Sequence, residues 1–339
     1  MRFSASAFAP ACASPNHCET DPLRLFPDAS GGEAAVTRYR VFPGMELDYR
    51  DVHAPACREL RDGSGERLEI HHCLEGRVEY RQNGRYFYLS PGDLAVARTS
   101  SLPPDSRFPT GHYHGITVTI DPAAAPECLS CILSDVEVRP ATLMEKLCPG
   151  GTVFTARSSR QVKHVFSELY AVPEDIRKGY LKVKLLELLL FLSTLSPEDG
   201  QTPHGCTSAQ VTLAEQVKTC LLAEPDRTLT LKTLSQQFNV SEAQIKSSFA
   251  RVYGMSPAAY ARSQRMHGAA ALLRETDRTV LDIACQFGYD NASKFARAFR
   301  DVIGVSPREY RAGAEYDSCA PQLGEKPVSL SDADVERRI

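Results

Sequence analysis

The sequence predicts an α+β protein of several domains: an N-terminal antiparallel β-barrel, connecting helices, and a C-terminal all-α domain built from two similar units. Between residues 36 and 122, short runs of alternating apolar and polar residues are separated by Gly and Pro turns, a pattern typical of antiparallel strands. Between residues 160 and 195, apolar residues recur at helical spacing. Near the C-terminus, one pattern of residues occurs twice. A chain of 339 residues has room for these parts.

The strand region begins after residues 1–34, which are rich in Ala, Ser, Pro and Gly and which we expect to form a disordered arm. Residues 77–82 and 85–89 flank Asn83-Gly84, and this spacing predicts a two-residue hairpin with Tyr80 opposite Phe87. Further strands are expected at residues 94–97 and 112–120. Several short strands with tight turns favour a small barrel.

The region after the strands is expected to be helical. Val162, Val165, Phe166 and Leu169 form one apolar stripe, and residues 180–195 are apolar on most faces. A helix with so broad an apolar surface needs two partners. We therefore expect it to pack on the barrel on one side and on a second subunit on the other, which makes the protein a homodimer.

The duplicated pattern predicts two pairs of helices. Six residues return fifty positions later: Phe249, Val252, Gly254, Ser256, Pro257 and Tyr260 recur as Phe299, Val302, Gly304, Ser306, Pro307 and Tyr310. In each copy a helix ends at Gly, and the next one begins with Ser-Pro. Upstream of each copy lies a short helix and a turn, at Asn239 and at Gly288. Helix, tight turn and helix form the helix-turn-helix motif, whose second helix enters the DNA major groove.

The helix that joins the two motifs suits double-stranded DNA. It runs from Pro257 to about Glu275 and would span roughly 30 Å at the usual helical rise. Adjacent major grooves on one face of B-DNA lie about 34 Å apart. We expect one chain to place two recognition helices in adjacent grooves. The alternative is a plain helical bundle with a repeated core spacing.

These residues carry a family resemblance. Residues 229–311 resemble the DNA-binding domain of the AraC/XylS transcription regulators, although Ser235 stands where the family usually has Ala and Asn239 where it usually has Gly. The shared pattern comprises Ile283-Ala284, Gly288-Tyr289, Phe295, Phe299, Gly304, Ser306-Pro307 and Tyr310-Arg311. Residues 74–93 resemble the cupin-like sensor domain of the same family. The resemblance implies a sequence-specific transcription regulator, an activator, that responds to a small-molecule effector bound in the barrel.

The predicted boundaries follow from these patterns. In chain order they are a disordered arm at 1–34, a cupin-like effector-binding barrel at 35–150, a helical dimerisation segment at 151–197, a linker at 198–208, an AraC-type DNA-binding domain at 209–312 and a disordered tail at 313–339.

The resemblance also assigns residues to DNA. Those that match groove-facing positions of the family are Ala243, Lys246, Ser247, Ser293, Lys294 and Arg297. Lys246 and Arg297 are the best candidates to read bases, because Lys or Arg to guanine is the commonest specific contact. The complete predicted set is Ala243, Gln244, Lys246, Ser247, Arg251, Arg265, Asn291, Ser293, Lys294, Arg297, Arg300, Arg308 and Arg311. The alternative for each charged residue is a solvated helix face.

Five residues of the predicted barrel are candidate effector ligands: His72, Tyr80, Arg98, His112 and His114. The three histidines lie on apolar-patterned faces of their strands and could converge inside the barrel. They are interpreted as effector ligands, as metal ligands or as structural residues. Since His71-His72 lacks the His-x-His spacing of metal-binding cupins, we expect no metal and no cofactor. The protein is then not an enzyme; the alternative is a metal-dependent cupin enzyme with a DNA-targeting domain.

Charge and cysteine usage fit a cytoplasmic DNA-binding protein. The net charge is −3, yet residues 209–312 hold 14 Lys and Arg against 10 Asp and Glu, a basic balance that suits phosphate. The 11 cysteines show no framework spacing, which indicates reduced thiols. Cys128 and Cys131 have redox spacing but are expected to be ordinary thiols. Residues 1–15 do not form a signal peptide, and residues 185–195 are too few to span a membrane.

Overall fold

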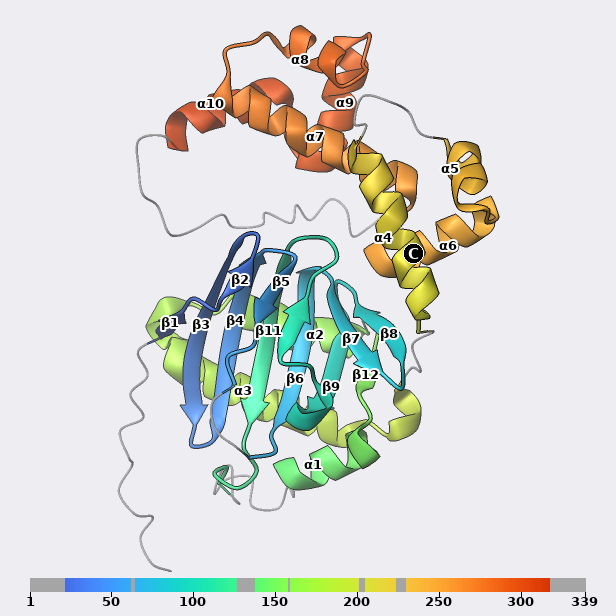
Figure 1. Cartoon of the computed structure of the whole chain (residues 1–339). Coiled ribbons are helices and arrows are strands. Elements are labelled where there is room, and N and C mark those ends of the chain that lie inside the picture. The colour runs from blue at the N-terminus through green and yellow to red at the C-terminus, as the bar shows by residue number, and fades with distance from the viewer. Residues whose placement is uncertain are drawn as a thin grey trace, which may run out of the picture. The chain divides into compact units, whose positions relative to one another are not determined.

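The computed structural model describes residues 22–61, 65–126, 138–157, 159–200, 205–223 and 230–317 (Figure 1). Cys128 and Cys131 lie outside these residues. Contacts divide the chain into two compact units, residues 1–217 with 231–256, and residues 218–230 with 257–339. The first unit contains the strands and the second contains the last four helices.

The first unit is built on a seven-stranded antiparallel sheet in the order β1-β3-β4-β11-β6-β9-β12. Its strands are β1 Leu23–Leu25, β3 Glu33–Phe42, β4 Met45–His53, β6 Leu68–Gly76, β9 Leu94–Arg98, β11 Tyr113–Ile120 and β12 Phe154–Ala156. A three-stranded sheet has the order β10-β5-β2, and a hairpin pairs β7 with β8. These strands are β2 Ala29–Ser30, β5 Ala56–Arg58, β7 Val78–Gln82, β8 Arg85–Leu89 and β10 Asp105–Arg107.

The prediction of a closed barrel is wrong for the described residues, which form antiparallel sheets that do not join into one cylinder. The large sheet has two edges, β1 and β12, that are not paired with each other. The physical reason is that helices pack on one face of this sheet (Figure 1), so its apolar side chains are buried without closure. Residues 23–25 and 29–30, expected within a loose arm, are strands.

The hairpin was predicted correctly. Tyr80 pairs with Phe87 and Val78 with Leu89. Asn83 and Gly84 have φ of 50° and 72°. Two consecutive positive φ angles are what a two-residue turn of this hand requires, and Asn and Gly are the residues that adopt them at least cost.

Three helices pack on the apolar face of the large sheet: α1 Pro140–Leu147, α2 Arg160–Tyr170 and α3 Arg177–Thr194. The predicted stripe Val162, Val165, Phe166 and Leu169 is the buried side of α2. It joins one cluster with Ile70, Ile116 and other residues of the sheet. The short 3-10 turns of this unit are η1 Thr99–Ser101, η3 Pro149–Gly151, η4 Glu174–Ile176 and η5 Pro197–Asp199.

The opposite face of the sheet is lined by buried ion pairs. Arg38 binds both carboxylate oxygens of Asp48, at 2.8 and 2.9 Å, and Arg50 binds both oxygens of Glu59 at 2.8 Å. Glu69 lies 2.9 Å from Arg61 and 3.1 Å from His71. Burial alone would raise the pKa of Glu69, but the hydrogen bond and charge of His71, together with Arg61, outweigh it and hold this pKa at about 2.

The remaining helices follow the predicted plan. They are α4 Ser208–Ala223, α5 Leu231–Phe238, α6 Glu242–Tyr253, α7 Pro257–Glu275, α8 Val280–Gln286, α9 Ala292–Ile303 and α10 Pro307–Asp317. The joining helix α7 has the predicted bounds, and α10 continues five residues past the predicted end of the domain at 312. No helix among the described residues is long and apolar enough to cross a membrane.

Candidate nucleic-acid interface

The first helix-turn-helix consists of α5 and α6. The chain turns at Asn239, whose φ of 51° is positive, so Asn here serves where the family usually has Gly. The Ser241 hydroxyl accepts a hydrogen bond from the Gln244 amide at 3.2 Å and caps the start of α6. Gly254, in the left-handed conformation with φ of 76°, ends α6.

The second helix-turn-helix consists of α8 and α9 and repeats this construction. Thr279 caps α8, and its hydroxyl accepts from the Asp282 amide at 3.1 Å. The turn passes through Gly288, with φ of 78°. Asn291 caps α9, and Gly304 ends it with φ of 91°. Each recognition helix therefore begins after a side-chain cap and ends at a left-handed Gly, and the Gly end is the one that the duplicated pattern predicts.

One side of each recognition helix is buried. Ile245, Phe249 and Val252 of α6 are at most 2 % exposed. Phe295 and Phe299 of α9 are fully buried, within a core cluster that α7 and α8 share. The opposite side is open: all six residues matched to groove-facing positions are exposed, namely Ala243, Lys246, Ser247, Ser293, Lys294 and Arg297. Burial of one side leaves these residues available to a partner.

The other predicted contact residues fall into two groups. Gln244, Arg251, Arg300 and Arg308 are exposed. Asn291, Arg265 and Arg311 make hydrogen bonds within the chain. The side-chain oxygen Oδ1 of Asn291 accepts from the backbone amides of Ser293 at 2.7 Å and Lys294 at 3.3 Å. The Arg265 side chain donates to the carbonyl of Ala261 at 3.4 Å.

The Arg311 side chain forms hydrogen bonds within its own domain. Its guanidinium donates to the carbonyls of Leu273 at 3.1 Å and Arg278 at 2.6 Å, and so ties α10 to the C-terminal end of α7. At the start of α10, Ser306 and Glu309 exchange hydrogen bonds of 2.8 and 3.2 Å, a capping box. The Ser306 amide lowers the pKa of the Glu309 carboxyl.

The predicted effector ligands do not gather in one place. His72 lies on the helix-covered face of the large sheet, where its ring stacks on Phe166 at 4.1 Å and its Nδ1 is 3.0 Å from the Tyr170 hydroxyl. Burial lowers the pKa of His72 to about 4. Tyr80 belongs to a different core cluster, and its ring lies 5.8 Å from that of His71. Burial raises the pKa of Tyr80 well above its usual value.

Arg98, His112 and His114 are nearer the surface. Arg98 donates to the Cys148 carbonyl at 2.9 Å and to Glu145 at 2.8 Å, and the hydrogen bond to Glu145 raises the pKa of Arg98. His112 directly precedes β11 and His114 is its second residue, and their ring centroids lie 6.5 Å apart. The expected convergence of the three histidines inside a barrel is wrong for this structure, because His72 lies on the helix-covered face whereas His112 and His114 are nearer the surface. His72 shares a face of β6 with Ile70, and α2 covers that face.

A cavity of about 220 Å³ lies instead between β3 and α3. Its lining is partly apolar, with Tyr39, Val41 and Leu181, and partly charged. The charged residues of the lining are Arg40, Glu174, Arg177, Lys178 and Lys182. Sequence reasoning missed this site, because its walls come from segments about 140 positions apart that only folding brings together.

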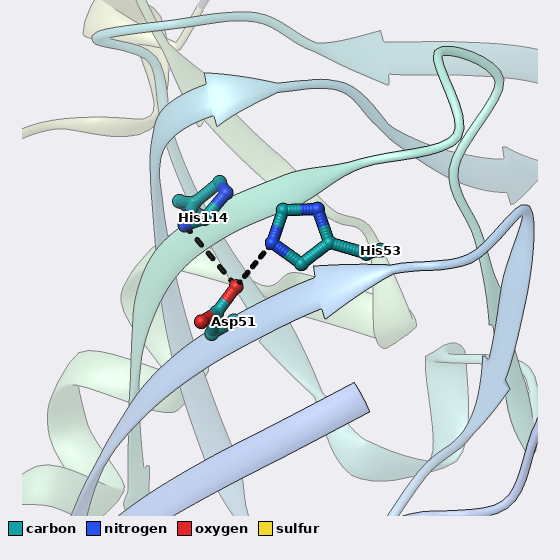
Figure 2. Close-up of side chains that lie close together, drawn as sticks. All are labelled: Asp51, His53 and His114. Carbon is teal, nitrogen blue, oxygen red and sulfur yellow. Dashed lines mark ion pairs between the residues drawn. The ribbon is translucent and has the colours of Figure 1, made fainter. Parts of the chain in front are cut away.

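Sequence reasoning also missed Asp51 and His53, which lie beside His114 (Figure 2). The sequence does hold a signal: Asp51 and His53 are two positions apart in a strand, so they share a face. The pairing of that strand with β11 is what the sequence alone did not reveal.

Comparison with known proteins places these features in a family. A helix-turn-helix domain family matches residues 234–313. The chain is 34 % identical over 275 residues to the uncharacterized HTH-type transcriptional regulator YdiP of Escherichia coli K12, covering 77 % of this chain and 88 % of that protein. It is 30 % identical over 305 residues to the melibiose operon regulatory protein of the same organism, covering 86 % and 95 %.

Other matches are shorter. One Streptomyces lividans protein, 30 % identical over 130 residues, is covered over 43 % of its length. Among solved structures, a probable AraC family transcriptional regulator from Rhodopseudomonas palustris is 32 % identical, with a TM-score of 0.29 over 30 % of this chain and 97 % of that one. The matches to the two Escherichia coli regulators are much longer than the helix-turn-helix domain at residues 234–313, so they extend beyond it. The chain belongs to the AraC/XylS family of transcription regulators.

Proposed function

We propose that this regulator is an activator that binds a specific site on double-stranded DNA, works as a homodimer in the cytoplasm, and responds to a small molecule held by its N-terminal region. The observation that carries the proposal is the pair of capped recognition helices with cationic outer sides. We assign the protein no catalytic role, because the relatives it matches along most of their length are regulators.

The predicted DNA-contact residues fall into groups according to whether the side chain is exposed or forms a hydrogen bond within the chain. Lys246 and Arg297 read bases, since both are exposed on the outer sides of α6 and α9 and both suit guanine. Ala243, Ser247, Ser293 and Lys294 lie beside them in the grooves. Gln244, Arg251, Arg300 and Arg308 are exposed and contact phosphates. Arg265, Asn291 and Arg311 support the domain through the hydrogen bonds within the chain.

The effector site is proposed at the cavity between β3 and α3, in place of the five dispersed residues. Four cationic side chains line it against one carboxylate, that of Glu174. Arg177 donates to the Tyr39 hydroxyl at 3.1 Å and to Glu174 at 3.3 Å, and Lys182 lies 5.7 Å from the centre of the Phe42 ring. This positive, partly apolar lining favours an organic anion of modest size.

Replacement of Arg297 by Ala tests the assignment to DNA. We expect Arg297→Ala to weaken binding to the cognate site by about 1–3 kcal/mol and to relax the preference at one base pair, because a base contact is lost. The cognate site is first found by mapping the DNA that the protein binds across a genome. Binding is then measured by fluorescence anisotropy with the site and with each single-base variant.

Arg274→Ala is the matched control, because Arg274 is an exposed Arg of α7 outside the predicted contact set. It should bind the site as the unmodified protein does. If Arg297→Ala also binds all the variant sites unchanged, Arg297 is not a base reader. If the protein selects no DNA at all, the proposed function itself fails.

A further inference from the structure

Three potential metal ligands share one face of the pair β4–β11. Asp51 and His53 are two positions apart in β4, so their side chains project from the same side. His114 lies directly opposite Asp51 in the antiparallel register. Directly paired residues bring their Cβ atoms to within about 5.5 Å of each other. The backbone therefore holds the three side chains together before any partner arrives.

Their ligand atoms already converge (Figure 2). The Asp51 Oδ1 atom lies 3.0 Å from His53 Nε2 and 3.4 Å from His114 Nδ1, and all the ligand atoms lie within 4.8 Å of one another. The two imidazole rings meet edge to face, with centroids 5.1 Å apart. One carboxylate oxygen thus lies between two imidazole nitrogens.

The spacing suits a small divalent cation. Ligand atoms about 2.0–2.1 Å from a tetrahedral zinc ion lie roughly 3.3 Å from each other. The two separations at Asp51 are close to this value. The side chains of His53 and Asp51 are 62 % and 58 % exposed, and that of His114 is 29 % exposed. An ion could enter from solvent and keep a position for water.

The ligand types narrow the choice of ion. Two imidazoles and one carboxylate suit zinc, copper, nickel or iron, whereas magnesium and calcium prefer sites made wholly of oxygen. No thiolate belongs to this cluster. Glu75 lies opposite His114 on the other neighbouring strand, β6, and adds negative charge nearby. We propose that Asp51, His53 and His114 bind one divalent transition-metal ion of the zinc class. This site is separate from the cavity between β3 and α3 and does not depend on the effector proposal.

Equilibrium dialysis of the full chain against Zn²⁺ tests the site. The protein carries no polyhistidine tag and is first treated with a chelator, and bound zinc is measured by atomic absorption. We expect one ion per chain, with affinity lowered tenfold or more in each of Asp51→Asn, His53→Gln and His114→Gln. His267→Gln, at an exposed His of α7, is the control and should bind as the unmodified protein does. Binding should weaken as the pH falls, because ligation needs neutral imidazoles.

The 11 cysteines of the chain are the competing ligands. Co²⁺ distinguishes them, because thiolate ligation gives an intense near-ultraviolet charge-transfer band that imidazole and carboxylate ligation lacks. After its thiols are alkylated, the chain without substitutions should still bind one Co²⁺. Its spectrum should show visible bands and lack the thiolate charge-transfer band. This result supports the site even if a variant misfolds. Loss of all Co²⁺ binding on alkylation, or equal zinc affinity in the three variants and the control, would overturn the proposal.

Discussion

At the scale of single residues, Asn291 is a predicted DNA contact that also has a role within the chain. Its side chain accepts two amide hydrogen bonds at the start of α9. A cap of this kind uses the acceptor that a base contact would need. The sequence marks Asn291 as polar and outward, which is correct, but the outward side of a first helical turn holds both caps and base readers.

We expect Asn291→Ala to destabilise the protein by about 1 kcal/mol, because the two amides lose their acceptor. Asn291→Ser and Asn291→Asp should restore most of this, since both side chains are good caps. Chemical denaturation measures the free energy of unfolding, and anisotropy with the cognate site measures DNA binding. If Asn291→Ser folds as stably as the unmodified protein but loses one base preference, Asn291 reads DNA.

His72 is a second residue whose surroundings determine its behaviour. Burial against Phe166 holds its pKa at about 4, below the ordinary value of 6.5. The folded state therefore binds the proton less tightly than the unfolded state. The stability that this group contributes is complete above pH 6.5 and is lost as the pH falls toward 4, by up to about 3 kcal/mol.

His72→Phe should remove this part of the pH dependence, because a Phe ring can stack on Phe166 and carries no proton to titrate. Urea unfolding at several pH values between 7 and 4 compares the slopes of stability against pH. The control is His164→Gln, at an exposed histidine of α2, which should keep the slope of the unmodified protein. Parallel slopes for His72→Phe and the unmodified protein would contradict the assignment.

At the scale of elements, local patterns predicted well wherever backbone chemistry decided the outcome. Asn83-Gly84 specified the hairpin, and Gly254 and Gly304 ended both recognition helices. The closed barrel failed for a different reason. Alternation shows that a strand has an apolar face, but it does not show whether helices or other strands cover that face. His72 was misplaced for the same reason, since its apolar face packs on α2.

The helix α3 carries an outward stripe at a spacing of four, three and four residues. Gly179 and Val183 are exposed, while Leu186 and Leu190 are half-buried, and the Val183 side of the helix is open to solvent, with Val183 itself 62 % exposed. The inward side, which includes Leu185 and Leu188, is fully buried. A stripe with this spacing fits a second helix of the same kind, which supports the proposed homodimer.

The double variant Val183→Glu, Leu186→Glu should be a monomer, because paired chains would bury four uncompensated carboxylates. Size-exclusion chromatography with light scattering measures the mass in solution. The control Leu23→Glu changes an apolar residue on β1 that is 48 % exposed and should leave the dimer intact. A monomeric mass for the unmodified protein at micromolar concentration would rule out this dimer.

At the scale of the whole molecule, the order of parts follows from the sequence, with strands first and paired helix-turn-helix motifs last. The length of α7 was also predictable, because Ser-Pro begins it and no interior residue breaks it. The candidate effector site was not predictable from the sequence, since Tyr39 and Leu181 come together only through tertiary packing. The spacing of α6 and α9 on DNA stays a prediction.

We expect small organic anions, tested against their neutral amide analogues, to raise the thermal unfolding temperature of the full chain. A ligand at 100 times its Kd adds about 2.7 kcal/mol to stability. The double variant Lys178→Ala, Lys182→Ala should lose this response, because half of the positive lining is removed. Lys163→Ala, at an exposed Lys of α2, is the control. An anion that stabilises both variants equally binds elsewhere.

Such an anion should also change the affinity for DNA, and DNA should change the affinity for the anion by the same factor. Anisotropy titrations with and without the anion measure the first change, and calorimetry with and without DNA measures the second. A ligand that binds the cavity but leaves DNA affinity unaltered would make the cavity a binding site without a regulatory role.

The ion pairs between the sheets leave cavities of only about 20 and 10 Å³ beside Arg38 and Arg50, room for roughly a single water molecule. The spaces beside these ion pairs are thereby too small for an organic effector. To engineer this protein as a biosensor, residues on the surface of α3 are therefore the ones to mutate. The ion-pair residues Arg38, Asp48, Arg50 and Glu59 are kept. Ligand specificity could then be changed by mutations at the surface of α3, while the buried ion pairs maintain the fold.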